Sequence, residues 1–287
     1  ENGGDNMKKA FALVLALAMA LTLVACGGPP ASSSAPASGS ASASAASAGT
    51  AEGDAEYAVI LKVLSSQYWQ TMRDGIEAKA EELGIKVDIY AANTEDDVEG
   101  QVSLLENAIS KGYKAIGVAP ISDVNLNNAI ADATEQGIKI VNIDEAINME
   151  ALTELGGAVY AYVATDNVKV GQMGAEYLIE QIGGEGEVAI VEGKAGTING
   201  DNRRDGATET FEAAGLTVVD SQPADWDRTK AYDLATNYIT AHPDLKAIYC
   251  CNDTMAMGVQ EAVGASGKGI KVCGTDGNGA ANQSAAG

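Results

Sequence analysis

Short apolar runs alternate with amphipathic stretches along most of this chain, and that alternation constrains its fold more than any other feature. The residues from Tyr57 to Leu61 form an apolar run. In the next segment Met72, Ile76 and Ala80 recur at helical spacing before Gly84 ends the helix. Repeated switching between these two periods predicts βα units, in which helices cover both faces of a parallel sheet.

The same alternation continues through two tandem series. The first predicts strands at 57–61, 86–90, 115–118 and 139–143, with helices ending at residue 83 and spanning 98–110 and 124–135. These four strands are expected to form one lobe. After 159–164, the second predicts helices at 168–182, 203–214, 229–241 and 254–265, and strands at 188–191, 217–219, 247–250 and 270–273. The sequence therefore predicts an α/β protein with two Rossmann-like, doubly wound lobes, 54–163 and 164–287, and a cleft between them.

The N-terminal segment has the composition of an export signal. Lys8 and Lys9 precede an apolar run at 10–24 that is short for a membrane span. The run ends in LVACG, which resembles the lipobox of bacterial lipoproteins, with Cys26 as the lipidated residue. A plain secretory signal cut near Ala25, with Cys26 incidental, is the alternative. Residues 1–6 precede Met7 and are interpreted as upstream read-through. Together with the signal peptide they make up residues 1–25.

A tether is expected to follow the signal. Residues 27–53 consist only of Ala, Ser, Gly, Pro, Thr and Glu, a composition that buries too little apolar surface to order itself. Residues 26–53 are therefore predicted to be a lipid-anchored flexible linker. The globular part would then work in the cell envelope or periplasm, at the outer face of the cytoplasmic membrane.

Charge and composition exclude several function classes. The chain has a formal net charge of −22, which disfavours nucleic acid as a partner. Its single histidine, His242, leaves almost no material for a catalytic triad or a multi-histidine metal site. The sequence contains no Gly-x-Ser-x-Gly elbow, Walker loop or dinucleotide motif. We therefore expect no enzyme activity, no cofactor and no metal.

Packing alone can explain the remaining cysteines, without a catalytic or metal-binding role. Cys250 and Cys251 are adjacent at the end of a predicted strand and Cys273 ends the next one. They are interpreted as buried small residues. A disulfide from Cys273 to either neighbour is the alternative.

Polar and aromatic side chains follow the predicted strands, where ligands bind in open α/β sheets. Carboxylates, amides, an arginine and both tryptophans dominate these segments, which suits a neutral, polyhydroxylated ligand with a flat apolar face. The alternatives are ordinary packing for Trp69 and Trp226, and a helix N-cap for Asp144 and Asp276. At least one of the adjacent Arg203 and Arg204 is expected to be a solvated helix charge.

Six motifs carry a family resemblance: YAVILK at 57–62, VNIDE at 141–145, EGKAG at 192–196, SQPADWDR at 221–228, NDTMAMG at 252–258 and GTDG at 274–277. Together they resemble the sugar-binding proteins of bacterial ABC importers, in the ribose and allose branch of the type I periplasmic binding proteins. The resemblance implies a monosaccharide bound between the lobes, closure about a hinge, a membrane permease as partner and a monomeric state. It also implies ten ligand contacts: Lys62, Ser66, Tyr68, Trp69, Asp144, Glu145, Arg203, Trp226, Asn252 and Asp276.

This sequence departs from the family pattern in places. Lys62 and Glu145 follow the allose branch, whereas the ribose branch tends to carry Ser and Arg there. Ser66 and Gln67 replace the usual Asn-Pro, which leaves the identity of the sugar open. The family continues beyond the equivalent of Asp276 with a strand, a return to the first lobe and a last helix. The second lobe is therefore expected to be incomplete in this chain.

Three other functions stay open on the residues alone. A sugar or autoinducer receptor that presents its ligand to a membrane sensor would have the same features. The effector-sensing core of a transcriptional repressor shares the fold, but it needs a helix-turn-helix where this chain has a lipobox. A secreted enzyme would use Asp144 or Asp276 as a base, and turnover of a sugar would reveal it.

Overall fold

Two parallel sheets organise the part of the chain that the structure, a computed structural model, describes, namely residues 55–278. The first sheet has the strand order β2-β1-β3-β4-β5 and the second β7-β6-β8-β9, and every neighbouring pair is parallel. In both sheets the chain winds outward from one central strand in both directions. The predicted α/β class with doubly wound parallel sheets is confirmed.

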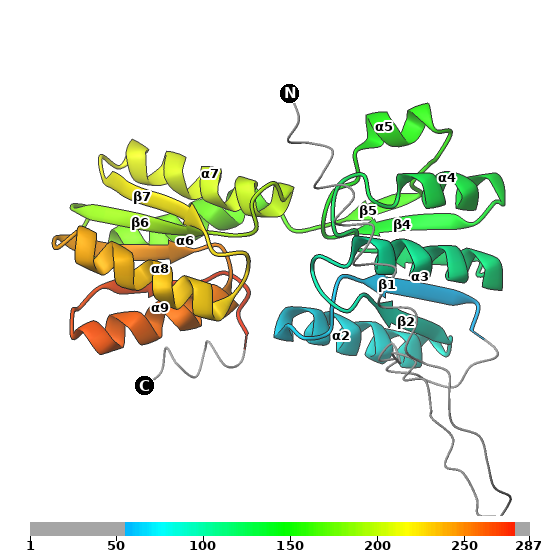
Figure 1. Cartoon of the computed structure of the whole chain (residues 1–287), viewed down its shortest axis with the longest axis horizontal. Coiled ribbons are helices and arrows are strands. Elements are labelled where there is room, and N and C mark those ends of the chain that lie inside the picture. The colour runs from blue at the N-terminus through cyan, green and yellow to red at the C-terminus, as the bar shows by residue number, and fades with distance from the viewer. Residues whose placement is uncertain (1–54, 279–287) are drawn as a thin grey trace, which may run out of the picture. The chain divides into compact units, whose positions relative to one another are not determined.

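The first sheet is built from residues 57–163 (Figure 1). Its strands are β1 (Tyr57–Leu61), β2 (Val87–Ala91), β3 (Ala115–Val118), β4 (Lys139–Ile143) and β5 (Ala161–Val163). The connecting helices are α2 (Gln67–Leu83), α3 (Val98–Lys111), α4 (Asn127–Glu135) and α5 (Met149–Glu154). Because successive strand residues point to opposite faces, Ile60 packs with α3 and α4, whereas Val59 and Leu61 pack with α2.

The second sheet is built from residues 167–273 (Figure 1). Its strands are β6 (Glu187–Glu192), β7 (Thr217–Pro223), β8 (Leu245–Cys250) and β9 (Lys271–Cys273), and its helices are α6 (Asn167–Ile182), α7 (Ile198–Ala213), α8 (Arg228–Ala241) and α9 (Asp253–Ser266). Helix α6 packs against α7, and α8 packs against α9. The first pair approaches so closely that a Cβ at Gly171 would lie 2.1 Å from the carbonyl oxygen of Arg203.

The structure corrects two details of the predicted first lobe. The segment after β4 adds a fifth strand, β5, which pairs with β4, so the sheet does not end at four strands. All three β5 residues are exposed, which explains why no buried-strand pattern marks the segment. The short helix α5 also lies between β4 and β5, and no helical period predicts it because it has only six residues.

Helix α7 begins at Ile198, five residues before the predicted start at Arg203. Its first turns carry Asn and Gly residues, which form helices poorly in isolation. The start of α7 is instead held by contacts from residues that follow β4, described below. Elsewhere the predicted strands agree with the structure to within a few residues, and β7 extends four residues further than expected, to Pro223.

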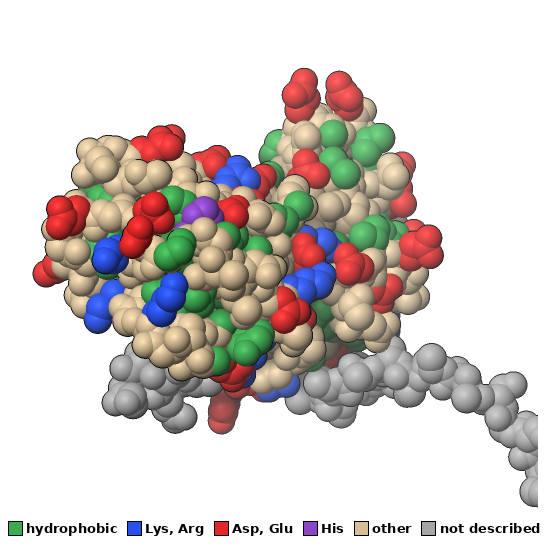
Figure 2. Space-filling model, turned by 60° about the vertical axis from the view of Figure 1, so that its left-hand side comes forward, with side chains coloured by type: hydrophobic (Ala, Val, Ile, Leu, Met, Phe, Trp, Pro, Cys, Tyr) green, Lys and Arg blue, Asp and Glu red, His purple; other side chains and the backbone are tan. Residues whose placement is uncertain are grey.

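Acidic side chains are spread over the face shown in Figure 2, with basic ones scattered among them. This distribution agrees with the net charge of −22. Within residues 55–278, no helix is both long enough and apolar enough to cross a membrane.

Candidate binding pocket

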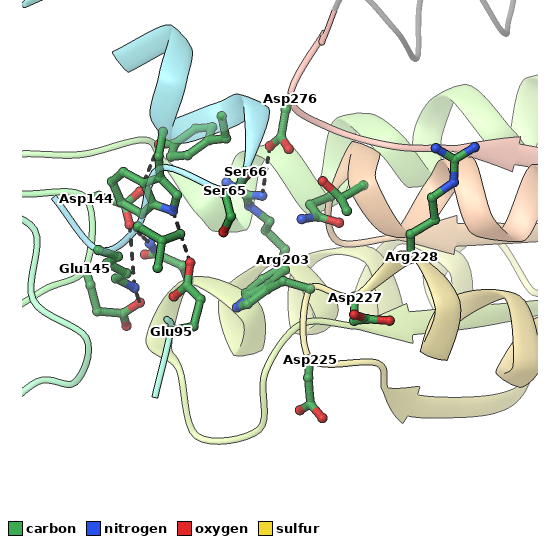
Figure 3. A pocket seen from close by; sticks show the side chains of 18 residues that line it. Ser65, Ser66, Glu95, Asp144, Glu145, Arg203, Asp225, Asp227, Arg228 and Asp276 are labelled. Atoms are coloured by element: carbon green, nitrogen blue, oxygen red, sulfur yellow. Dashed lines mark hydrogen bonds and ion pairs between the residues drawn. The ribbon is translucent and has the colours of Figure 1, made fainter. Parts of the chain in front are cut away.

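A cavity of about 390 Å³ is lined by residues that follow the strands of both sheets, at the carboxyl ends of these strands (Figure 3). This volume is in the range of pockets that bind small molecules. Residues after β1, β2 and β4 line it together with residues after β6, β7, β8 and β9. The lining is Lys62, Val63, Ser65, Ser66, Tyr68, Trp69, Glu95, Asp144, Glu145, Asn199, Arg203, Asp225, Trp226, Asp227, Arg228, Asn252, Thr254 and Asp276.

All ten residues predicted as ligand contacts line this one cavity. The structure therefore brings together side chains that are up to 214 residues apart in the sequence, as reading the residues after each strand predicts. That they contact a ligand stays a prediction. The cavity also includes Glu95 and Asn199, which that reading did not single out. Glu95 follows β2, so the same rule finds it once it is applied to β2.

Lys62, Asp144 and Glu145 form a buried charge cluster on one side of the pocket. Lys62 Nζ donates to Glu145 Oε2 at 3.2 Å and lies 3.9 Å from Asp144 Oδ2. Asp144 Oδ1 accepts from the Tyr68 hydroxyl at 2.9 Å. Burial and this carboxylate raise the pKa of Tyr68, so the phenol stays protonated as a donor. Asp144 also has a positive φ of 66° and does not cap a helix, since Asn148 caps α5, so the N-cap alternative for Asp144 is wrong.

The two indole rings come from different halves of the lining. Trp69 in α2 is buried, its ring meets that of Tyr68 edge-on at 5.0 Å, and Lys62 Nζ lies 5.9 Å from its ring centroid. Trp226 follows β7, and its ring lies over Gly193, where a Cβ would come within 2.0 Å of ring atom Cη2. Both rings therefore border the cavity, and the absence of a side chain at Gly193 makes room for one of them.

Arg203 and Asp276 form a second ion pair in the pocket lining (Figure 3). Arg203 Nη1 lies 3.4 Å from Asp276 Oδ1 and donates to the Cys251 carbonyl at 2.7 Å, and its Nε donates to Asn167. Burial raises the pKa of Asp276, although the nearby guanidinium opposes the shift. Arg204, by contrast, is 30% exposed at its side chain and pairs at 2.8 Å with the exposed Asp201 and Asp205, besides a longer contact with Glu192, so it is the more solvated member of the adjacent pair.

Asn252 and Asp276 meet at the start of α9. The Asn252 side chain caps the helix by accepting from the Met255 amide at 2.8 Å. Asp276 Oδ2 accepts from the Asp253 amide at 3.3 Å, so it also serves this helix start without being its N-cap. Both residues thus have a structural role besides lining the cavity.

Three residues other than glycine have a positive φ in the part of the chain that the structure describes, and all three line the pocket: Asp144 at 66°, Asp225 at 53° and Trp226 at 61°. This backbone region is unfavourable for residues with a Cβ, and such strain tends to gather at functional sites. The strained turn after β7 aims Trp226 at Gly193.

Glu95 provides a pH-dependent prediction. Its Oε1 accepts from Trp69 Nε1 at 3.1 Å, and burial raises its pKa above the usual 4.5, with Lys62 and Lys194 opposing the shift and Asp144 adding to it. Between the pKa of Glu95 in the unfolded chain and its raised pKa in the folded protein, the folded state binds more protons than the unfolded state. The stability of the wild type should therefore fall as the pH rises through this range. Glu95→Gln keeps an acceptor for the indole, and we expect its free energy of unfolding relative to wild type to increase from pH 4 to pH 7.

Denaturant unfolding at several pH values measures this difference. Glu81→Gln, at an exposed position of α2, is the matched control and should show a much smaller pH-dependent difference. A difference between Glu95→Gln and wild type that does not change with pH would contradict the expected ionisation.

The cysteines are not activated as nucleophiles. Cys250, Cys251 and Cys273 are free thiols, and burial raises the pKa of Cys251 to about 12 and that of Cys273 to about 11. A thiol with such a pKa stays protonated and is a poor nucleophile. Within residues 55–278, no three His, Cys, Asp or Glu side chains are grouped so as to hold a metal ion.

Known proteins are similar to this chain in sequence and in fold. A family model described as "Periplasmic binding protein domain" matches residues 57–286. The D-allose-binding periplasmic protein of Escherichia coli is 53% identical over 227 residues, which cover 78% of this chain and 73% of that protein. The ribose import binding protein RbsB of Bacillus subtilis is 34% identical, over 78% of this chain and 70% of that protein.

A solved structure agrees with these matches. An ABC transporter periplasmic solute binding protein from Actinobacillus succinogenes, with bound D-allose, superimposes with a TM-score of 0.77 and 35% identity, over 80% of this chain and 81% of that one. The matches confirm the resemblance that the six motifs predict. The chain belongs to the periplasmic binding protein family.

Proposed function

We propose that this chain is the extracytoplasmic binding component of an ABC sugar importer, and that its pocket binds a neutral monosaccharide such as D-allose or a ribose-like sugar. Relatives named for allose and ribose binding support this assignment. So does the solved structure with bound D-allose.

One observation carries the proposal: two indoles from different halves border a single cavity that is otherwise lined by hydrogen-bonding side chains. Flat aromatic faces suit the C–H faces of a sugar ring, while carboxylates accept from its hydroxyl groups and Arg or Asn donates to its oxygens. Six carboxylates and three cationic side chains line the cavity, which disfavours a sugar acid or a sugar phosphate.

Binding is proposed to close the two lobes, 54–163 and 164–287, about a hinge, so that the closed form is presented to permease subunits in the membrane. Cys26, the proposed lipid attachment site, and the proposed tether 26–53 lie outside the described residues. The protein would act as a monomer held to the outer face of the cytoplasmic membrane, and it would return its sugar unchanged.

Thermal melts of the full-length protein with allose, ribose, galactose, glucose and xylose test the proposal. A sugar at 100 times its dissociation constant should stabilise the protein by about 2.7 kcal/mol, which raises the midpoint measurably. Glucuronate is the charged control and should give no shift. NMR of the sugar after incubation should show no product.

A cooperative melt that no neutral sugar shifts would contradict the sugar assignment. Conversion of the sugar would contradict the receptor assignment and favour an enzyme.

A further inference from the structure

The Glu145 carboxylate joins the two halves of the pocket lining. It follows β4 and is 2% exposed. Its Oε2 accepts from Lys62 Nζ at 3.2 Å, and its Oε1 accepts from the backbone amide of Ile198 at 2.7 Å. Ile198 is the first residue of α7, which belongs to the second sheet. Protein donors therefore occupy both oxygens of Glu145, so this side chain already has partners without a ligand.

Helix α7 lacks a cap of its own. Thr197 stands at the N-cap position in an extended conformation, but its hydroxyl donates back to the Lys194 carbonyl and makes no capping bond. The first amides of a helix need acceptors, and Glu145 supplies one from the other half of the lining. A carboxylate also interacts favourably with the positive end of the helix dipole.

A second contact strengthens this connection. Asp144, the neighbour of Glu145, accepts at Oδ2 from Asn199 Nδ2 at 3.0 Å. Asn199 in turn accepts from Asn167, which accepts from Arg203 Nε at 2.7 Å. Two successive carboxylates after β4 thus hold the first turn of α7, and the same helix carries Arg203 into the pocket.

We propose that Glu145 is a positioning residue: it links Lys62 to the start of α7 and thereby holds Asn199 and Arg203 at the ligand, without contacting the ligand itself. This role rests on the proposed function of the pocket. It differs from the contact role that the family resemblance implies for Glu145. Loss of the link should weaken binding by releasing α7, whichever sugar hydroxyl groups are present.

Ile198→Pro tests the link at one atom. Proline removes the amide proton that Glu145 accepts, yet it is well tolerated at the first position of a helix. The preceding Thr197, with φ −96° and ψ 128°, already has the conformation that proline requires before it. Ile198→Ala is the matched control because it shortens the same side chain, which is 38% exposed, and keeps the amide proton.

The protein and its variants are compared by calorimetry with the sugar that gives the largest thermal shift. A hydrogen bond to a charged group should contribute about tenfold or more to affinity when it holds the binding geometry. Ile198→Pro and Glu145→Ala should each weaken binding by about this factor, and the double variant no more than either alone. Ile198→Ala should bind within about twofold of wild type, since surface changes usually have small effects.

Hydrogen exchange gives a readout other than affinity. Because the link joins the two proposed lobes, exchange is measured in the closed form, with each protein saturated by sugar. Amides in the first turn of α7 should then exchange faster in Glu145→Ala than in wild type. Reduced affinity in Glu145→Ala with wild-type affinity in Ile198→Pro would overturn the inference, because Glu145 would then act through the sugar or through Lys62 and not through α7. Unchanged exchange in saturated Glu145→Ala would also overturn it.

If wild type binds none of the sugars, the proposed function and its hinge closure fail together, and exchange is compared without a sugar. Faster exchange of the first turn of α7 in Glu145→Ala would then leave the link standing, and equal exchange would overturn it.

Discussion

Replacing Arg203 with methionine is expected to abolish sugar binding and to lower the free energy of unfolding by about 3–5 kcal/mol, the usual cost of removing one partner of a buried ion pair. The Arg203 and Asp276 side chains are only 9% and 5% exposed. The substitution leaves the Asp276 carboxylate without its cation and removes one of the two donors to the Cys251 carbonyl, the other being the Thr275 hydroxyl. A domain at the lower end of the ordinary range of about 5–15 kcal/mol would become marginal.

Denaturant unfolding and sugar titration measure the two effects separately. Arg204→Met is the matched control: the neighbouring side chain is 30% exposed, its two shorter contacts are with the exposed Asp201 and Asp205, and its third, to the half-buried Glu192, is 3.4 Å long. Its loss should cost about 1 kcal/mol or less. Equal losses in the two variants would contradict the assignment of Arg203 to the buried pair.

The deficit of Arg203→Met should also depend on pH. Burial already raises the pKa of Asp276, and removal of the guanidinium, which opposes that shift, should raise it further. Protonation then removes the uncompensated buried charge, so the variant should lose less stability at pH 5 than at pH 8. A deficit that grows as the pH falls would contradict this explanation.

Gly193→Ala is expected to weaken sugar binding by about tenfold or more, because it displaces an aromatic ring that borders the pocket. The added Cβ would lie 2.0 Å from Cη2 and 2.2 Å from Cζ2 of Trp226, both atoms of a rigid ring. The backbone of Trp226 is already strained at a φ of 61°, so it has little freedom to rotate and relieve the overlap. The ring itself must therefore move away from the added Cβ. Stability should fall by about 1–3 kcal/mol, as for other overpacked sites.

Titration calorimetry and tryptophan fluorescence measure the displacement. Gly264→Ala in α9 is the control, because nothing lies within 4 Å of the Cβ that it adds. Trp226→Ala should lose at least as much affinity as Gly193→Ala, and the double variant should bind no worse than Trp226→Ala. A further loss in the double variant would show that Gly193 acts on binding through another contact.

The periodicity of the sequence predicts most of the fold because it reports burial directly. The strands β1, β3 and β4 lie where their apolar runs predict them. Glycines at the ends of α2 and α3 take the left-handed conformation that ends a helix. The rule that ligands bind beyond the carboxyl ends of parallel strands needs only the order of the strands, and it predicts the polar segments that line the cavity. The ten residues that the family resemblance implies lie in these segments and line one cavity.

Three features escaped that reasoning because contacts distant in sequence decide them. The exposed edge strand β5 is defined by its pairing with β4 and has no hydrophobic pattern of its own. The positive φ of Trp226 occurs at a residue type that rarely adopts it, so the sequence gives no sign of it. The position of Glu95 after β2 can be read from the sequence, but its hydrogen bond from the Trp69 indole cannot, because only packing brings the two side chains together.

The sequence by itself thus determined the order of strands and helices, the two-lobed class and the edge where polar residues gather, since each depends on local hydrophobic spacing and chain direction. Only the tertiary structure decided which residues contact one another across the pocket. The start of α7 is the clearest case: Asn199 and Gly200 favour no helix there, and the helix begins at Ile198 where Glu145, 53 residues earlier, accepts the amide proton of its first residue. A hydrogen bond to a buried carboxylate, of about 1.5–3 kcal/mol, outweighs unfavourable helix propensities of up to about 1 kcal/mol per residue, and no local pattern encodes it.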